Sequence, residues 1–336
     1  MANVLVTHAD EPLGRRIVKS LYHDPEVEHL ITVGAGAPPR AFDRFLADAT
    51  RRLSYLRVDL ARHRSVSDLF HSSALREAEV DTVVHVPRHG ATQDEEAPVA
   101  SGLPLRTAEA RLVVQHCLEV RSIRHLVAIG SAFVYRLQPG NANRLCETSE
   151  LDLDPAVPPE LRAWIDCDMT FHGEVGADRL RVVLLRVPTV VESGGFVYLN
   201  PGLAGQARLR FRPLGFDPMC ALVADKDVAR AVRAAVQSDR AGIYNVAGVE
   251  SVPLSVLSRW TRRPALPAPG VLLRLAATGL RWAGASGGSA LQGDHLRYGF
   301  TLDTQLAERE LGYLPAYRIG LSRAGDGVLR LETSAA

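Results

Sequence analysis

Several side chains capable of acid, base or nucleophilic chemistry lie in or directly after apolar runs of this 336-residue chain. Ser131 follows the run at 125–129, and His85 lies inside a similar run. Asp168 and His172 are four residues apart, so they would share one face of a helix. A serine activated by a histidine and a carboxylate could carry out hydrolysis. Ser131 lacks the Gly-x-Ser-x-Gly elbow that presents such a nucleophile, which argues against a hydrolase.

The spacing of metal-ligating residues and thiols does not favour a metal site or a thiol nucleophile. His89 and Asp166 are expected near the same pocket as Ser131. Asp168 and His172 could be two ligands of a metal ion, but no third ligand is spaced to join them. Cys167 has no identifiable base and is interpreted as an inert thiol. The chain has no C-x-x-C pair, because its four cysteines are far apart, at Cys117, Cys146, Cys167 and Cys220. We expect no metal ion.

The elements that must position these groups alternate between strands and helices. Apolar, β-branched runs predict strands at 4–6, 29–33, 55–58, 82–86, 125–129 and 181–186. Helical spacing is found at 14–22 and 106–120. This alternation is typical of βαβ units. It predicts an α/β fold with a doubly wound parallel sheet of Rossmann type, followed by a smaller mixed α/β lobe.

The pattern changes near residue 190, which indicates two domains. Residues 1–190 are assigned to the Rossmann-type domain, with a later strand contributed from about 215–248, and 191–330 to the smaller lobe. Two polar stretches, 88–103 and 138–159, are expected to be loops. Both follow the carboxyl ends of strands, the edge at which open α/β sheets bind ligands.

Charge and hydropathy exclude several classes of partner. The 39 lysines and arginines nearly balance 38 aspartates and glutamates, so no global field favours nucleic acid. The first predicted strand begins too early for a signal peptide to precede it. The apolar stretch at 269–285 is interrupted by Arg274 and Arg281, so it predicts an amphipathic helix and no transmembrane segment. These features predict a cytoplasmic protein.

Seven segments, in order along the chain, resemble the extended short-chain dehydrogenase/reductase family, also called the NAD-dependent epimerase/dehydratase family. The resemblance implies a Rossmann domain that binds NAD or NADP, and a sugar-nucleotide-like or other small hydroxy or keto substrate. Ser131 takes the position of the catalytic hydroxyl. The segments are 4–14, 58–60, 81–86, 131–135, 185–188, 222–229 and 242–248, with a further match at 310–315. The implied cofactor contacts are His8, Asp10, Glu11, Leu13, Gly14, Asp59, Leu60, Val86 and Val187.

The phosphate loop departs from the family's Gly-x-x-Gly-x-x-Gly pattern. The three positions are His8, Glu11 and Gly14, so only the glycine that allows close helix packing remains. His8 adds a side chain where the turn must be tight. Glu11 adds a carboxylate near the expected diphosphate, and two like charges about 4 Å apart repel by roughly 4 kcal/mol at an effective dielectric constant of 20. Binding of NAD or NADP is therefore expected to be weak or absent.

The residues Asp10, Glu11 and Pro12 also make a self-sufficient helix start. The sequence predicts Asp10 as an acidic N-cap, Glu11 in the first turn and Pro12 near the first helical position. Negative charge is favourable at a helix N-terminus, where a cofactor phosphate would otherwise lie. The protein is thus predicted to supply from its own chain what a bound phosphate supplies elsewhere.

The ribose-binding positions carry little of the expected chemistry. An acidic residue commonly follows the second strand in NAD-binding proteins, but here Gly34 or Ala35 occupies that place. Arg40 could meet a 2′-phosphate or could be a solvated loop residue. Asp59 could contact adenine, as the resemblance implies, or could be the N-cap of a helix over 61–70.

The catalytic tyrosine and lysine of the family are both replaced. Trp164 and Asp168 occupy the two positions, and no Tyr-x-x-x-Lys occurs elsewhere in the chain. Tryptophan exchanges no proton near neutral pH, and a carboxylate raises the pKa of a neighbouring phenol. Tyr135 lies too early in the sequence to substitute. Hydride transfer by the usual mechanism is not expected.

Three functions follow from these observations. The first is a non-redox ligand sensor, regulatory subunit or interaction module, with a small molecule or a protein as partner. The second is an active NAD(P)-dependent epimerase, dehydratase or reductase that uses Ser131 with Asp168 or a water as base. The third is a hydrolase or lyase built on Ser131 and a histidine. By analogy with the family, helices over 106–120 and 164–178 could form a homodimer.

Overall fold

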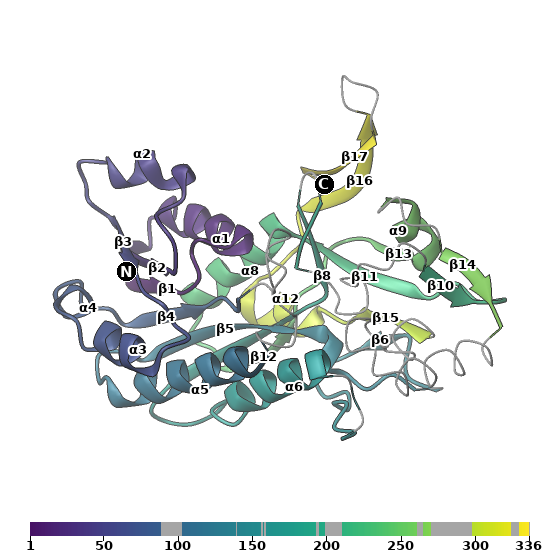
Figure 1. Ribbon diagram of the computed structural model, residues 1–336, viewed down its shortest axis with the longest axis horizontal. Helices are drawn as coiled ribbons and strands as arrows, with labels where there is room; N and C mark the ends of the chain where they lie inside the picture. The colour runs from purple at the N-terminus through teal and green to yellow at the C-terminus, as the bar shows by residue number, and fades with distance from the viewer. Residues whose placement is uncertain are drawn as a thin grey trace.

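A seven-stranded parallel sheet forms the centre of the protein (Figure 1). The computed structural model describes residues 1–88, 103–138, 140–155, 157, 159–192, 195–198, 210–260, 265–269, 298–323 and 329–335. The strand order is β12-β7-β5-β4-β1-β2-β3. Their bounds are β1 Ala2–Val6, β2 Val27–Gly34, β3 Leu53–Arg57, β4 Thr82–His85, β5 His125–Ser131, β7 Arg181–Val187 and β12 Gly242–Asn245. The predicted fold class is confirmed.

Consecutive residues of the central strands point to opposite faces of this sheet. On β1, Val4 and Val6 belong to one buried cluster and Leu5 to the other. On β5, Val127 belongs to the same cluster as Val4 and Val6, and Leu126 belongs to the cluster of Leu5. Strands buried on both faces need apolar residues at every position, which explains their continuous apolar runs.

Helices cover both faces of the sheet. Helices α1 (Pro12–Tyr22) and α8 (Asp225–Gln237) pack on one face, and α3 (His63–Phe70), α5 (Leu103–Glu119) and α6 (Pro159–His172) pack on the other. In Figure 1, α5 and α6 lie side by side below the sheet. The remaining described helices are η1 Arg40–Phe42, α2 Asp43–Leu46, α4 Ser73–Glu77, η3 Ala132–Val134, α9 Leu254–Trp260 and α12 Gln305–Leu311.

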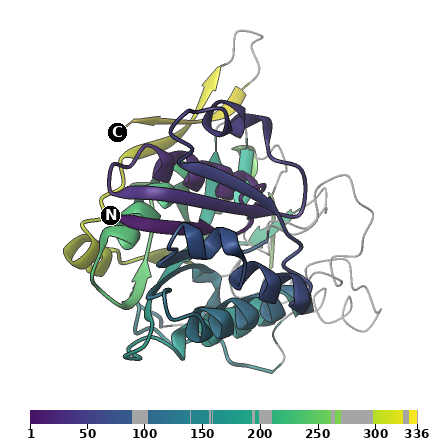
Figure 2. The same cartoon turned by 90° about the vertical axis from the view of Figure 1, so that its left-hand side faces the viewer.

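A smaller mixed sheet builds the second lobe. Its order is β6-β15-β11-β8-β9, and β13 pairs with β11. The C-terminal hairpin of β16 and β17 extends from the body of the protein (Figure 2). The bounds are β6 Arg144–Leu145, β8 Thr189–Glu192, β9 Gly195–Tyr198, β11 Met219–Ala224, β13 Ser251–Pro253, β15 Gly299–Leu302, β16 Tyr317–Arg323 and β17 Leu329–Ala335, with a separate pair β10 Arg210–Pro213 and β14 Ala265–Ala268.

Several predicted boundaries need correction. The expected loop at 138–159 contains the short strand β6, and α6 begins at its last residue. Helix α1 begins two residues before the predicted 14–22, because Pro12 suits a first helical position. Most of 88–103, including His89, and nearly all of the stretch 269–285 lie outside the described residues. Within the described part of the chain, no helix is long and apolar enough to cross a membrane.

Candidate cofactor and active site

The turn after β1 lies where ligands bind in sheets of this order. The order reverses between β1 and β4, so their carboxyl ends form the edge of a crevice. At this turn His8 is buried and adopts φ +46°, a left-handed conformation that favours glycine. A Cβ on Gly14 would lie 2.1 Å from the carbonyl oxygen of His8. The helix and the turn therefore approach too closely for any side chain at Gly14.

The imidazole of His8 contacts a carboxylate from helix α5. Its Nε2 lies 3.2 Å from Oε2 of Glu109, on α5, and both residues are buried. Arg88 donates to Oε1 of the same carboxylate at 3.1 Å. Burial opposes ionisation of Glu109, but the hydrogen bond from His8 and the charges of His8 and Arg88 outweigh it and lower its pKa. In this His8–Glu109–Arg88 cluster, both carboxylate oxygens of Glu109 have a partner at the turn after β1.

Asp10 does not cap α1, contrary to the prediction. Its carboxylate accepts a hydrogen bond from the backbone N–H of Gly36 at 3.2 Å. Glu11 is the N-cap residue, but its side chain makes no capping hydrogen bond. The carboxylate of Asp10 instead lies beside the end of β2, where a Cβ on Gly34 would be 2.4 Å from Asp10 Cγ. The predicted self-capping by Asp10 and Glu11 is therefore wrong, because Asp10 is directed to the neighbouring loop.

The acidic groups around the turn make a poor fit for a dinucleotide diphosphate. Burial raises the pKa of Glu11, the charge of His8 opposes this, and the charge of Asp10 adds to it. The nearby Arg88 guanidinium and His8 imidazole already contact Glu109. A diphosphate placed at this turn would meet three carboxyl groups and a guanidinium that is already paired with Glu109, which costs free energy at short range.

The other implied cofactor positions are mostly apolar core. Leu13, Leu60, Val86 and Val187 are all buried. Asp59 is not the N-cap of the following helix, because α3 begins at His63 and its N-cap is Arg62. The carboxylate of Asp59 accepts from the N–H of Ala61 at 3.1 Å and pairs with Arg62 at 3.2 Å. Arg40 is exposed in η1.

Trp164 and Ser131 are both buried near the carboxyl end of β5. The guanidinium carbon of Arg106 lies 4.1 Å from the centroid of the Trp164 ring, a cation–π contact. The hydroxyl oxygen of Ser131 accepts a hydrogen bond from the N–H of Phe133 at 3.2 Å and thereby caps η3. The serine therefore has a structural role in the turn after β5.

Asp168 forms a buried ion pair with Arg186. The Nε and Nη2 atoms of Arg186 donate to the two carboxylate oxygens of Asp168 at 2.8 and 2.7 Å. Both side chains are at most 1% exposed. Burial opposes the charge of Arg186, but the contact with Asp168 outweighs it and raises the guanidinium pKa. Asp168, which the sequence resemblance aligns with the family's lysine, is thus an acid whose charge is neutralised within the protein.

Tyr135 extends this ion pair into a hydrogen-bond network. Arg186 donates to the Tyr135 hydroxyl at 3.1 Å, and that hydroxyl donates to Oδ1 of Asn245 at 2.7 Å. The N–H of Asn245 donates to Glu147 at 2.8 Å. Burial raises the pKa of Tyr135 to about 12. Sequence reasoning missed this network; its one signal was Arg186 inside an otherwise apolar strand.

Of the histidines suggested for hydrolysis, His89 lies outside the described residues, and neither His85 nor His172 hydrogen-bonds to Ser131. His85 instead contacts the hydroxyl of Thr7, at 3.1 Å, and burial lowers its pKa to about 3. His172 is exposed, whereas Asp168 on the same helix is buried. Burial raises the pKa of Cys167 to about 11. The described residues contain no group of three histidines, cysteines or carboxylates arranged to hold a metal ion.

The chain resembles known proteins in its three-dimensional structure and not in its sequence. No protein-family model matches the chain, and no curated protein matches it in sequence. The solved structure of gox2253 has a TM-score of 0.68 and 17% identity, over 94% of each chain. UDP-glucose-4-epimerase from Stenotrophomonas maltophila, with bound NAD and formylated UDP-arabinopyranose, has a TM-score of 0.65 and 15% identity, over 95% of this chain and 94% of that chain.

A dehydratase shows the same likeness. A double mutant of DesIV, the dTDP-glucose 4,6-dehydratase of Streptomyces venezuelae, with NAD bound, has a TM-score of 0.61 and 20% identity, over 93% of this chain and 92% of that chain. At this level of identity, similarity of structure establishes the fold and leaves the activity open. The chain has the fold of the NAD-dependent epimerases and dehydratases, as the sequence motifs predicted.

Proposed function

We propose that this chain is a non-redox protein on an epimerase/dehydratase scaffold, acting as a ligand-sensing, regulatory or interaction module. The buried pair of Asp168 and Arg186 carries this proposal. In the related chemistry a tyrosine exchanges the proton and a lysine lowers its pKa. Here an acid stands at the lysine position, and both of its oxygens are held by one arginine.

The tyrosine position supports the same conclusion. Trp164 has no exchangeable proton of suitable pKa. Tyr135 is the nearest phenol in this network, but it donates to Asn245, and burial raises its pKa to about 12. A general acid or base works best when its pKa is near the operating pH. Neither residue meets this condition.

The turn after β1 favours weak or absent binding of NAD or NADP. The His8–Glu109–Arg88 cluster and the nearby carboxylates of Asp10 and Glu11 oppose a diphosphate. A partner of this protein would then be another small molecule or a protein. A cytoplasmic location and a homodimer through α5 and α6 remain predictions from the sequence.

The alternative is an active NAD(P)-dependent epimerase, dehydratase or reductase. The observation in its favour is the likeness, over more than nine-tenths of the chain, to solved structures that contain NAD. In such an enzyme Ser131 would donate the hydroxyl hydrogen bond and a water would be the base. Asp168 is less suitable as the base, because both of its oxygens accept from Arg186.

Thermal unfolding with millimolar NADH or NADPH distinguishes the two functions. A ligand at 100 times its Kd stabilises a protein by about 2.7 kcal/mol, which would raise the melting temperature measurably. We expect no shift with either dinucleotide. A clear shift, together with turnover of a nucleotide sugar or a keto substrate, would establish the enzyme and overturn our proposal.

A further inference from the structure

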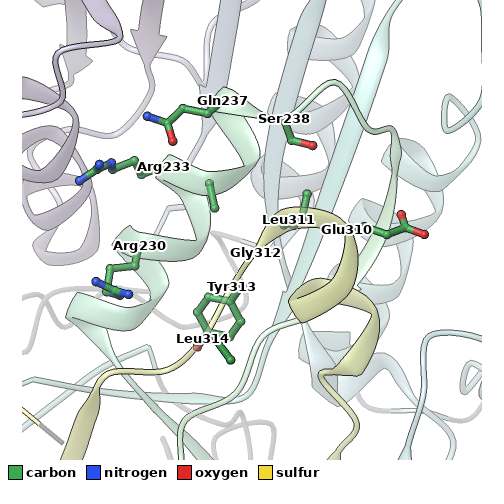
Figure 3. A pocket seen from close by; sticks show the side chains of 10 residues that line it. Arg230, Arg233, Gln237, Ser238, Glu310, Leu311, Gly312, Tyr313 and Leu314 are labelled. Atoms are coloured by element: carbon green, nitrogen blue, oxygen red, sulfur yellow. The ribbon is translucent and has the colours of Figure 1, made fainter.

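A cavity of about 360 Å³ lies between α8 and the end of α12 (Figure 3). Gln237, at the end of α8, donates to both carboxylate oxygens of Asp24, at 2.8 and 3.1 Å. Asp24 lies between α1 and β2, so this end of α8 is at the amino-terminal edge of the parallel sheet. The cavity is therefore on the opposite edge from the turn at His8. We propose that it binds a small organic phosphate.

Two arginines contribute the guanidinium groups that would contact an anion. Arg230 and Arg233 line the cavity and are three residues apart, which places them on one face of α8. In Figure 3 they extend from the same side of the helix. About half of each side chain is exposed, 51% for Arg230 and 47% for Arg233. Both guanidinium groups are thus accessible to a ligand from solvent.

The inner nitrogen of each guanidinium is the atom that lies nearest to a buried acid. The Nε of Arg233 lies 3.1 Å from Asp24, and the Nε of Arg230 lies 3.9 Å from Asp227. Both carboxylates are fully buried. Within the described part of the chain, both arginines make their ion pairs through Nε, and no hydrogen bond to another described residue is found for their terminal nitrogens. These nitrogens form the planar fork that binds phosphate oxygens in pairs.

The geometry favours a phosphate monoester over a single carboxylate. One carboxylate can satisfy one guanidinium fork, whereas a phosphate has three free oxygens and about two negative charges. Among the described residues that line the cavity, the one other charged group is Glu310, which is held by the hydroxyl of Tyr244 at 2.8 Å. Its carboxylate points away from the arginines in Figure 3.

Apolar side chains beside the arginines indicate an organic ligand. Ala234, Leu311 and Leu314 line the same cavity, and Leu314 is 54% exposed. Covering exposed apolar surface stabilises a complex in proportion to the area buried. A phosphate with an apolar body would use both the guanidinium groups and this surface. This site is independent of the proposed function, because it does not depend on what binds at the turn after β1.

Titration calorimetry with phenyl phosphate and with inorganic phosphate tests the inference. We expect phenyl phosphate to bind, and more tightly than inorganic phosphate. Arg230→Gln should weaken binding by about tenfold or more, since a charge-assisted hydrogen bond contributes roughly 1.5–3 kcal/mol. Arg230 is the better variant to test because its contact with Asp227 is long, so folding should be unaffected.

Arg233→Lys is the second variant. It keeps a cation beside Asp24 but removes the fork, and it should also weaken binding. Arg309→Gln is the matched control, because Arg309 is exposed on α12 but does not line the cavity. Hydrogen exchange should show protection at 230–238 and 310–314 when phenyl phosphate is bound. No binding, equal binding of the two phosphates, equal losses in Arg230→Gln and Arg309→Gln, or protection elsewhere would each overturn the inference.

Discussion

Asp168 and Arg186 face each other across α6 and β7 with two parallel hydrogen bonds, at 2.8 and 2.7 Å, in a site almost closed to water. A buried charge is tolerated when its partner matches it in geometry and number of hydrogen bonds. Arg186 also donates hydrogen bonds to the hydroxyl of Tyr135 and to the backbone carbonyl of Glu147. The buried charge of Asp168 is thus balanced by a cation on strand β7.

Breaking this pair should cost much of the stability of the fold. Asp168→Asn leaves the Arg186 charge buried without a counter-charge, and we expect the free energy of unfolding to fall by about 3–5 kcal/mol. The double variant Asp168→Leu with Arg186→Met should recover most of that loss, because no buried charge remains. Urea unfolding of the three proteins measures both effects. A loss below about 1 kcal/mol in Asp168→Asn would contradict the role assigned to the pair.

His125 makes the folded protein sensitive to acid. It is 1% exposed at the start of β5, and neither of its ring nitrogens has a partner among the described residues. Burial, with the charge of Arg181, lowers its pKa from 6.5 to about 3. The unfolded chain therefore binds a proton that the folded chain does not, so stability should decrease as the pH falls from 6.5 to 3.

His125→Leu should remove the part of the acid sensitivity that comes from His125. It also removes two buried ring nitrogens that have no hydrogen-bond partner among the described residues, so the free energy of unfolding should rise by about 1–3 kcal/mol at neutral pH. Chemical unfolding between about pH 7 and pH 4 checks the change in slope. His29→Leu, at an exposed position, is the control. The same acid dependence in His125→Leu as in the wild type would show that His125 is not its source.

Gly14→Ala should destabilise the Rossmann domain. A Cβ would lie 2.1 Å from the carbonyl oxygen of His8, which belongs to the backbone and cannot rotate away. Overpacking of this kind costs typically about 1–3 kcal/mol. Gly320→Ala is the control, since no heavy atom lies within 4 Å of a Cβ there. Thermal unfolding that shows equal changes in the two variants would refute the close approach.

Removing the obstructing side chains at the turn should create dinucleotide binding. His8 adopts a left-handed conformation that glycine takes without strain, and Glu11 places a carboxyl group beside the expected diphosphate. His8→Gly with Glu11→Gly should therefore bind NADH at least about tenfold more tightly than the wild type, measured by fluorescence titration. Glu28→Gly is the control for loss of one exposed acid. Unchanged affinity in the double variant would refute the electrostatic argument.

Local patterns were sufficient to predict the fold. Strands buried on both faces require continuous apolar runs, and that property alone locates β1, β4 and β5 in the chain. The absence of a Tyr-x-x-x-Lys pair is likewise visible in the sequence, and from spacing alone we predict that Trp164 and Asp168 take those two positions. Such features depend on residues that are close together in the chain, so they can be predicted from the sequence without the tertiary structure.

Contacts between distant segments decided the rest. His8 and Glu109 are 101 residues apart, and Asp168 and Arg186 lie on different elements, so no periodic pattern links either pair. The carboxylate of Asp10 was expected at a helix end but is held by Gly36. The sequence by itself determined the fold class and yielded predictions of which residues occupy the cofactor and catalytic positions. Only the tertiary structure decided how their charges are balanced, because a buried charge takes whichever partner the packing of separate strands and helices brings to it.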